Sequence, residues 1–216
     1  MFLYQLWQQS PRLVLDYIIA MLVAITLHEL AHAVWAERLG DPTPRAFGRI
    51  SLNPIRHLDP VGTLMFFLAG IIWATTPTNP ANYRIGARKG SAQVALMGPL
   101  TNFVLAFLAA IPLRFGLLAG VDADLARYAA EILFIFVQLN LLLTVFNLLP
   151  IPPLDGFSVL LGILPEEQAR SLAPVAQQGP MLLFFVFVLG SFSGFNFFGQ
   201  VIDPPVHVLS QLVLGR

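Results

Sequence analysis

Residues 11–39 read PRLVLDYIIAMLVAITLHELAHAVWAERL, an apolar run with a cluster of polar side chains in its second half. About 20 mostly apolar residues are needed for a helix to cross the hydrocarbon core of a bilayer, and this run is long enough. Ser10 suits the N-cap and Pro11 the first helical position, while Gly40 and Pro42 end the helix. The stretch predicts a transmembrane helix that carries polar side chains.

The composition of the chain agrees with a membrane protein. Of its 216 residues, 56% are apolar and 11% are charged, whereas an ordinary soluble domain has about 25% charged residues. The 12 basic and 12 acidic residues cancel, so no strong field attracts nucleic acid. The absence of cysteine excludes thiolate zinc sites and cysteine nucleophiles. We expect one integral-membrane domain over residues 1–216.

Other apolar runs predict the rest of an all-α polytopic bundle. Residues 91–111 and 125–149 are long enough to span. A catalytic core over about residues 11–165 would then be followed by an additional helix and tail at 180–216, of which the part from 201 is short and apolar. The sequence does not decide where this tail lies.

Three shorter segments lie between the first two spanning helices. The run at 61–74 is too short to span and predicts a re-entrant segment. Residues 45–52 alternate weakly and predict a short strand, and residues 75–82 predict an extended loop. Seven of the 12 basic residues fall between Arg38, at the end of the first helix, and Lys89, just before the next, so the positive-inside rule places the whole stretch in the cytoplasm. The helices at 11–39 and 125–149 then run in the same direction.

His28, Glu29 and His32 form an H-E-x-x-H motif on the first helix. Histidines four residues apart share one helical face and can bind one zinc ion, and Glu29 lies where it can take a proton from a metal-bound water. The alternative is that these polar side chains merely pair with one another in the bundle. Ionisable residues are costly inside a membrane and mark functional sites, which favours the metal.

A catalytic zinc takes a third protein ligand, for which Asp155 in the sequence PIPPLDG (150–156) is the best candidate. The prolines break the helix, and irregular backbone at membrane depth lines protein or a wet cavity. An ordinary turn with a solvated aspartate is the alternative. If the run at 61–74 is re-entrant, Asp155 and His28 lie at the same depth. Asp59 is the serious rival ligand.

Four stretches together resemble the site-2 protease family of intramembrane zinc metalloproteases, in the compact branch without PDZ or CBS domains. They are HELAH (28–32), LGDPTPRAFGRISLNPIRHLDPVGTL (39–64), GPLTNF (98–103) and NLLPIPPLDG (147–156). The resemblance implies one Zn²⁺ held by His28, His32 and Asp155, with Glu29 as the catalytic base. It implies cleavage of transmembrane protein substrates within the lipid bilayer. The basic residues place the active site toward the cytoplasmic side, and we expect a multi-pass protein of the plasma membrane. The oligomeric state stays open.

Five further polar residues lie near or along these motifs. The resemblance suggests that Asn102 faces the site to hold substrate or polarise the scissile carbonyl; an interhelical hydrogen bond is the alternative. Asn140, Thr144 and Asn147 share one helical face, where the first two are expected to pack and Asn147, closer to the bend, is a second candidate for substrate binding. We expect His57 to fix a turn.

The chain departs from the family in the predicted loop. Where the branch shows a stretch like G-W-A-K-P-V-P-V-N-P, residues 72–80 read IWATTPTNP, one position shorter and without the lysine. Substrate docking at this loop is therefore open. The expected function is intramembrane proteolysis; the alternatives are a proteolytically silent relative that binds membrane proteins, and a transporter, which the lack of paired broken helices disfavours.

Overall fold

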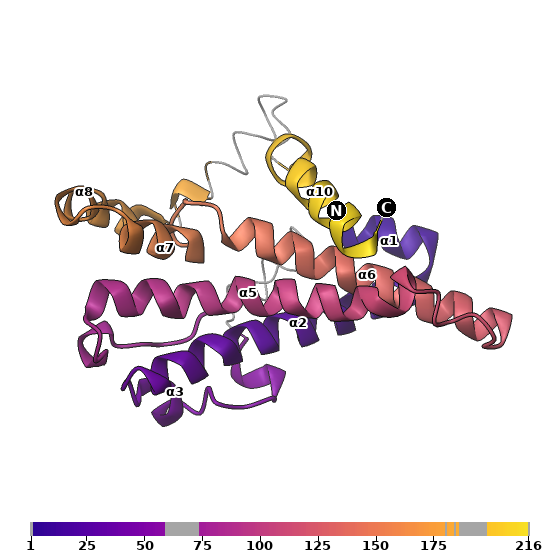
Figure 1. Cartoon of the computed structure of the whole chain (residues 1–216), viewed down its shortest axis with the longest axis horizontal. Helices are drawn as coiled ribbons and strands as arrows, with labels where there is room; N and C mark the ends of the chain where they lie inside the picture. Colours follow the sequence, from indigo (N-terminus) through magenta and orange to yellow (C-terminus); the bar gives the residue numbers. More distant parts are fainter. Residues whose placement is uncertain (1, 59–73, 180, 184, 186–197, 216) are drawn as a thin grey trace.

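The computed structural model describes residues 2–58, 74–179, 181–183, 185 and 198–215, and helices joined by turns and loops make up this part of the chain. The α-helices are α1 (Phe2–Gln9), α2 (Pro11–Arg38), α3 (Thr43–Ala46), α5 (Ala87–Arg114), α6 (Ala123–Asn147), α7 (Asp155–Ile163), α8 (Glu166–Leu172) and α10 (Asp203–Leu214). Short 3₁₀ turns lie at Pro54–Arg56, Pro80–Asn82 and Ala173–Gln178, and a π turn at Phe198–Ile202. No β-strand occurs within these ranges, so the predicted all-α class is confirmed (Figure 1).

Three of these helices, α2, α5 and α6, are long and apolar enough to cross a membrane. The expected N-cap of α2 forms: Ser10 Oγ accepts a hydrogen bond from the Arg12 backbone N–H at 3.3 Å. Asp122 caps α6 by accepting from the backbone N–H groups of Asp124 and Leu125. The predictions at 91–111 and 125–149 are confirmed with slightly shifted ends. The 28 residues of α2 rise about 42 Å, more than the hydrocarbon core requires.

The three long helices alternate in direction, as the sequence predicts. Arg12 of α2 pairs with Glu131 near the start of α6 at 3.0 Å, and the C-terminal half of α2 meets the segment that follows α6, so these helices run parallel. Helix α5 runs the opposite way, because Asn102 contacts His28 while the earlier Val94 contacts the later His32. Figure 1 shows the three helices side by side, with α3, α7 and α8 gathered at one end.

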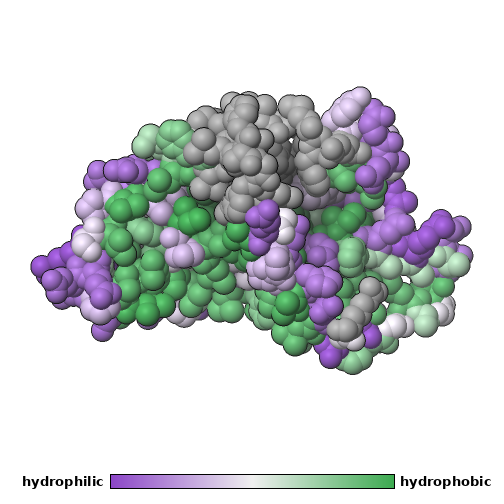
Figure 2. Space-filling model, turned by 90° about the horizontal axis from the view of Figure 1, so that it is seen from above, coloured by the Kyte–Doolittle hydropathy of each residue, from purple (hydrophilic) through white to green (hydrophobic). Residues whose placement is uncertain are grey.

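Small residues allow these helices to pack closely. Ala24, Ala106 and Ala110 are fully buried, and small side chains at helix contacts let backbones approach in membrane proteins. Two apolar clusters link α2 to α6 and α5 to α6. The second cluster also contains Val213 and Leu214, so the C-terminal helix α10 packs on α5 and α6, which the sequence left undecided. Figure 2 shows hydrophobic residues over much of the middle of the molecule and hydrophilic residues towards both ends.

The predicted strand at 45–52 is wrong. The side chain of Asp41 accepts from the Thr43 N–H at 3.1 Å just ahead of the short helix α3, and Gly48 then turns the chain with φ at 66°. A hydrogen bond from Arg49 N–H to the Pro44 carbonyl closes this turn. Within the described part of the chain no strand pairs with this segment, and weak alternation alone does not hold an extended backbone. Helix α1 was not predicted.

Two predictions fall largely outside the described residues: the re-entrant run at 61–74 and the helix at 180–198. The re-entrant prediction requires the chain to return to the side from which it leaves. Leu58 and Ala74, which flank residues 59–73, form an isolated antiparallel bridge and therefore lie side by side. A single crossing of the membrane between them would instead separate these residues by about 30 Å.

Candidate metal centre

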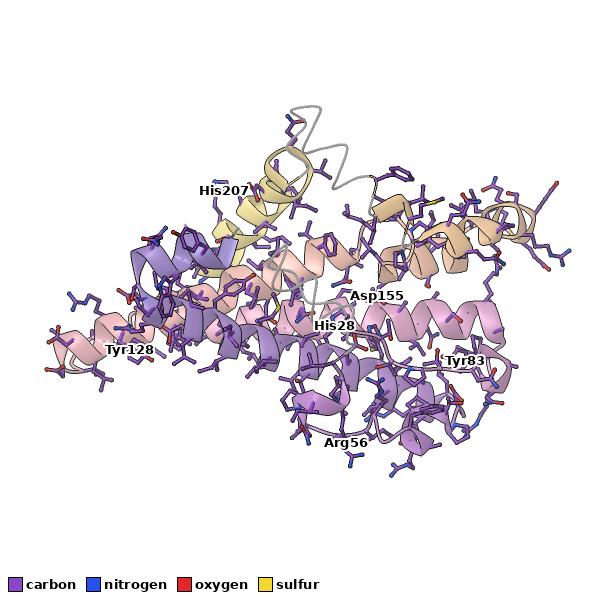
Figure 3. All side chains as sticks on the ribbon, turned by 180° about the vertical axis from the view of Figure 1, so that it is seen from behind. His28, Arg56, Tyr83, Tyr128, Asp155 and His207 are labelled. Carbon is purple, nitrogen blue, oxygen red and sulfur yellow. The ribbon has the colours of Figure 1, made fainter. Side chains whose placement is uncertain are left out.

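Side chains from two distant parts of the chain meet inside the bundle. His28 and His32 are 3% and 7% exposed on α2, and Asp155 is the first residue of α7. The ring atoms His28 Nε2 and His32 Nε2 lie 3.0 Å apart, and Asp155 Oδ2 lies 3.2 Å from the first and 3.3 Å from the second. Figure 3 shows His28 and Asp155 close together near the middle of the molecule.

These three atoms have the spacing of one face of a zinc tetrahedron. With Zn–N bonds of 2.0–2.1 Å, two ligands of a tetrahedral zinc are separated by about 3.3–3.4 Å. The observed separations of 3.0, 3.2 and 3.3 Å lie close to that value. A tetrahedron has a fourth corner, which a catalytic site keeps free for water or substrate.

A chain of hydrogen bonds fixes which nitrogen of His28 carries its proton. The backbone carbonyl of Phe136 accepts from Asn140 Nδ2 at 2.8 Å, so Asn140 Oδ1 is left to accept from Asn102 Nδ2, also at 2.8 Å. Asn102 Oδ1 then accepts from His28 Nδ1 at 2.5 Å. Because Nδ1 is the donor, neutral His28 directs the lone pair of Nε2 at the other two atoms.

His32 is held in the same tautomer by the backbone. Its Nδ1 donates to the carbonyl oxygen of Val94 on α5 at 2.7 Å, and a backbone carbonyl can only accept. Both histidines therefore point lone pairs at Asp155 Oδ2, which is buried and has no hydrogen-bond partner. Three electron pairs facing one another repel unless a cation lies between them, so these residues fit a zinc ion. The partners of the two Nδ1 atoms, Asn102 and the Val94 carbonyl, orient the rings as histidine ligands of a metal require.

Glycine is required where α5 passes this site. A Cβ built on Gly98 would lie 2.5 Å from His28 Nε2 and from His28 Cε1, which is closer than real contacts allow. Because Gly98 has no side chain, the two imidazole rings can pack directly against the backbone of α5. Gly156 has a comparable role next to Asp155, because any side chain there would strike the carbonyl of Leu148 as the chain turns from α6 into α7.

Glu29 faces the same space as the two histidines. It is 3% exposed, and its carboxylate and the ring nitrogens of His28 and His32 all lie within 4.8 Å of one another. The hydroxyl of Thr76 lies 2.7 Å from Glu29 Oε2, to which it can donate. A carboxylate beside the metal face and within reach of a bound water is the arrangement that general-base catalysis requires.

Asn102, Asn147 and Asp59 were the other residues predicted for the site. Asn102 is fully buried, and its amide bonds to His28, Asn140 and the Ala24 carbonyl. It therefore makes interhelical hydrogen bonds, which the sequence left as the alternative to substrate binding. Asn147 is half-buried at the end of α6, and its amide donates to the Leu143 carbonyl at 3.0 Å. The rival ligand Asp59 lies outside the described residues.

The other polar residues make contacts that do not include the three candidate ligands. Thr144 donates to the Asn140 carbonyl at 2.8 Å and lies 3.3 Å from the Pro99 carbonyl oxygen, so it joins α6 to α5. His57 is fully buried and its Nε2 donates to the Ser51 carbonyl at 2.7 Å, so it fixes a turn as predicted. His207 is on α10, far from His28 in Figure 3.

Sequence reasoning missed several contributions to the site. Thr76 was seen only as part of a divergent loop. The carbonyl of Val94 carries no signal in the sequence, because every residue has one. Gly98 was quoted in a motif without a role; a glycine within a membrane helix signals close packing, and here the neighbour is a candidate metal ligand.

A buried H-E-x-x-H helix and a carboxylate brought in after another membrane helix define the class of intramembrane zinc metallopeptidases. The family model described as Peptidase family M50 matches residues 16–129 and 115–191. The chain belongs to this family, which is the site-2 protease family that its motifs resemble, and is an integral membrane protein.

Curated relatives carry names of the same kind. The chain is 37% identical over 197 residues to YwhC of Bacillus subtilis, covering 88% of this chain and 87% of the relative. It is 35% identical over 187 residues to Rip2 of Mycobacterium tuberculosis strain H37Rv, covering 83% and 69%, and 35% identical over 169 residues to Rip2 of Mycolicibacterium smegmatis, covering 75% and 62%. All three are named as candidate zinc metalloproteases. No solved structure matches the chain.

Proposed function

We propose that this chain hydrolyses a peptide bond in or near the transmembrane segment of a membrane-protein substrate, at a zinc site made of His28, His32 and Asp155. The observation that supports the proposal is the convergence of three lone pairs at separations of 3.0–3.3 Å beside a buried carboxylate. The relatives named as zinc metalloproteases support the choice of metal.

Each residue has one task in the proposed reaction. Bound zinc supplies Lewis-acid activation of the attacking water and of the substrate carbonyl. Glu29 accepts the proton of the water and holds it for the leaving amine. Asn102 keeps His28 in the tautomer that leaves Nε2 free, and the Val94 carbonyl does the same for His32. We assign Asn102 to positioning rather than to substrate binding, and Asn147 to the edge of the site.

Water and substrate must both reach this buried site. We place it toward the cytoplasmic side of the plasma membrane, because seven of the 12 basic residues fall between Arg38, the last residue of α2, and Lys89, in the first turn of α5. One of these basic residues, Arg88, donates to the Leu164 carbonyl at 2.5 Å, so the start of α5 and the end of α7 lie at the same end of the bundle. The substrate helix must unwind locally, because a helical peptide bond is shielded by its own hydrogen bonds.

The decisive experiment compares two glutamates on the same helix. Purified Glu29→Gln, Glu37→Gln and wild-type protein are incubated with a single-pass transmembrane reporter, and bound zinc is measured. Glu37 pairs with Arg45 outside the site, so it is the matched control. Glu29→Gln should keep its zinc and lose cleavage by about 10²–10⁴-fold, the range for a general base, whereas Glu37→Gln should cut normally.

Two results would contradict the proposal. Cleavage by Glu29→Gln at the wild-type rate would remove Glu29 from the mechanism. Zinc-loaded wild-type protein that binds reporters without cutting any of them would instead identify a proteolytically silent relative.

A further inference from the structure

The loop that departs from the family pattern reaches the candidate catalytic base. Residues 75–79 lie outside any helix or strand and follow the bridge between Leu58 and Ala74. From this segment, Thr76 Oγ1 lies 2.7 Å from Glu29 Oε2 and 3.2 Å from the Glu29 backbone carbonyl. The shorter distance and the negative charge favour donation to the carboxylate. The hydroxyl therefore occupies Oε2 of Glu29, and among the described residues no hydrogen bond to the second carboxylate oxygen occurs.

A buried carboxylate fixes the far end of this segment. Asp41, just beyond α2, is fully buried. Its oxygens accept from Asn79 N–H at 2.6 Å, Asn82 Nδ2 at 2.9 Å and Thr43 Oγ1 at 2.6 Å. Burial raises the pKa of the Asp41 carboxyl, but these hydrogen bonds outweigh burial and hold that pKa below its usual value. Asp41 is therefore charged at neutral pH and anchors the loop to the end of the helix that carries Glu29.

We propose that Thr76 is a positioning residue for Glu29, held in place by the Asp41 anchor. The inference rests on the proposed role of Glu29 as the base. A glutamate side chain loses considerable rotamer entropy when it is held in one conformation. Thr76 lies between the Leu58–Ala74 bridge and the Asn79–Asp41 hydrogen bond, so its hydroxyl can order Glu29 before substrate binds. One carboxylate oxygen is then held by Thr76 while the other stays available for the proton of the water.

The test removes the hydroxyl while keeping the shape of the side chain. Thr76→Val has the same size without the donor, Thr76→Ser keeps the donor, and Thr75→Val is the matched control because Thr75 is exposed in the same loop. Hydrogen bonds to charged groups correspond to about a tenfold to hundredfold effect. Thr76→Val should lose that factor in kcat with KM and bound zinc unchanged, and Thr76→Ser should recover it.

A structural role for the loop alone predicts another pattern. If Thr76→Val cuts like Thr75→Val, or if Thr76→Ser is as impaired as Thr76→Val, the positioning role is overturned. Loss of zinc or a raised KM with normal kcat would also overturn it, because either result places Thr76 in metal binding or substrate docking.

A second readout does not depend on cleavage. The native chain has no cysteine, so Glu29→Cys with Thr76→Cys introduces one defined pair. A short bifunctional thiol reagent, which bridges the length lost when glutamate becomes cysteine, should cross-link this pair and should not cross-link Glu29→Cys with Thr75→Cys. If the wild-type protein cuts no reporter, the proposed function fails, and the cross-link still decides the contact: its formation supports the inference and its absence overturns it.

Discussion

Replacing Gly98 with alanine places one methyl group against a candidate zinc ligand. The added Cβ would lie 2.5 Å from His28 Nε2, about 0.9 Å inside the 3.4 Å at which ordinary van der Waals contact begins. Helix α5 cannot retreat freely, because Gly98, Pro99 and Asn102 are all buried. The imidazole ring of His28 must therefore move by most of this distance. Zinc–ligand distances vary by only about 0.2 Å, so the shifted ring no longer completes the site.

The displacement of His28 sets the expected loss of zinc affinity. Disturbing the groups that orient a ligand costs about 10–100-fold in metal affinity, and we expect Gly98→Ala to lose at least that factor, with cleavage lost in parallel. Competitive titration of purified protein with a zinc chelator measures the affinity, and a transmembrane reporter measures the cleavage. Leu100→Ala, an exposed position two residues along the same helix, is the control and should bind zinc normally.

If no metal ligand lies beside Gly98, the alanine substitution should have the opposite effect on the protein. Alanine is favoured over glycine inside a helix by about 1 kcal/mol. Without a ligand beside Gly98, the substitution would therefore leave zinc binding unchanged and raise the thermal midpoint of unfolding. Normal zinc affinity in a stabilised Gly98→Ala protein would refute the placement of His28 and of the metal.

Three further predictions concern the ligands and the topology. Asp155→Asn should lose most of its bound zinc on metal analysis, and full retention would move the third ligand elsewhere. Asn102→Ala should lower zinc affinity about 10–100-fold in the same chelator titration, because His28 loses the partner that fixes its tautomer. Single cysteines at Phe47 and Lys89, both exposed, should react with impermeant reagents only from the cytoplasm; labelling of either from outside would refute the proposed orientation.

Periodicity and composition were sufficient for the helices but not for the short connection after α2. The long apolar runs predicted α2, α5 and α6 because a spanning helix satisfies its own backbone hydrogen bonds and needs only length and apolarity. The segment at 45–52 was misread as a strand, because its conformation depends on the carboxylate of Asp41 and on Gly48 rather than on alternation. Asp41 also reaches Asn79, 38 residues away, and no local pattern reports that contact.

The sequence alone determined the chemical elements of the site. Two histidines four residues apart share a helical face whatever surrounds them, so His28, Glu29 and His32 could be predicted from spacing. The absence of cysteine left histidine, aspartate and glutamate as possible third ligands, and the proline-rich break favoured Asp155 over Asp59. These conclusions follow from local geometry and from the donor atoms that the chain contains.

Only the tertiary structure decided how these elements are oriented. The tautomer of His28 depends on a relay through Asn102 and Asn140 that ends at the carbonyl of Phe136, and that of His32 on the carbonyl of Val94. The same is true of the room left by Gly98 and of the hydroxyl that Thr76 brings to Glu29. Such contacts join residues far apart in the chain at distances of about 3 Å. They exist only once α2, α5 and α6 have packed, because packing sets which carbonyls and side chains face one another.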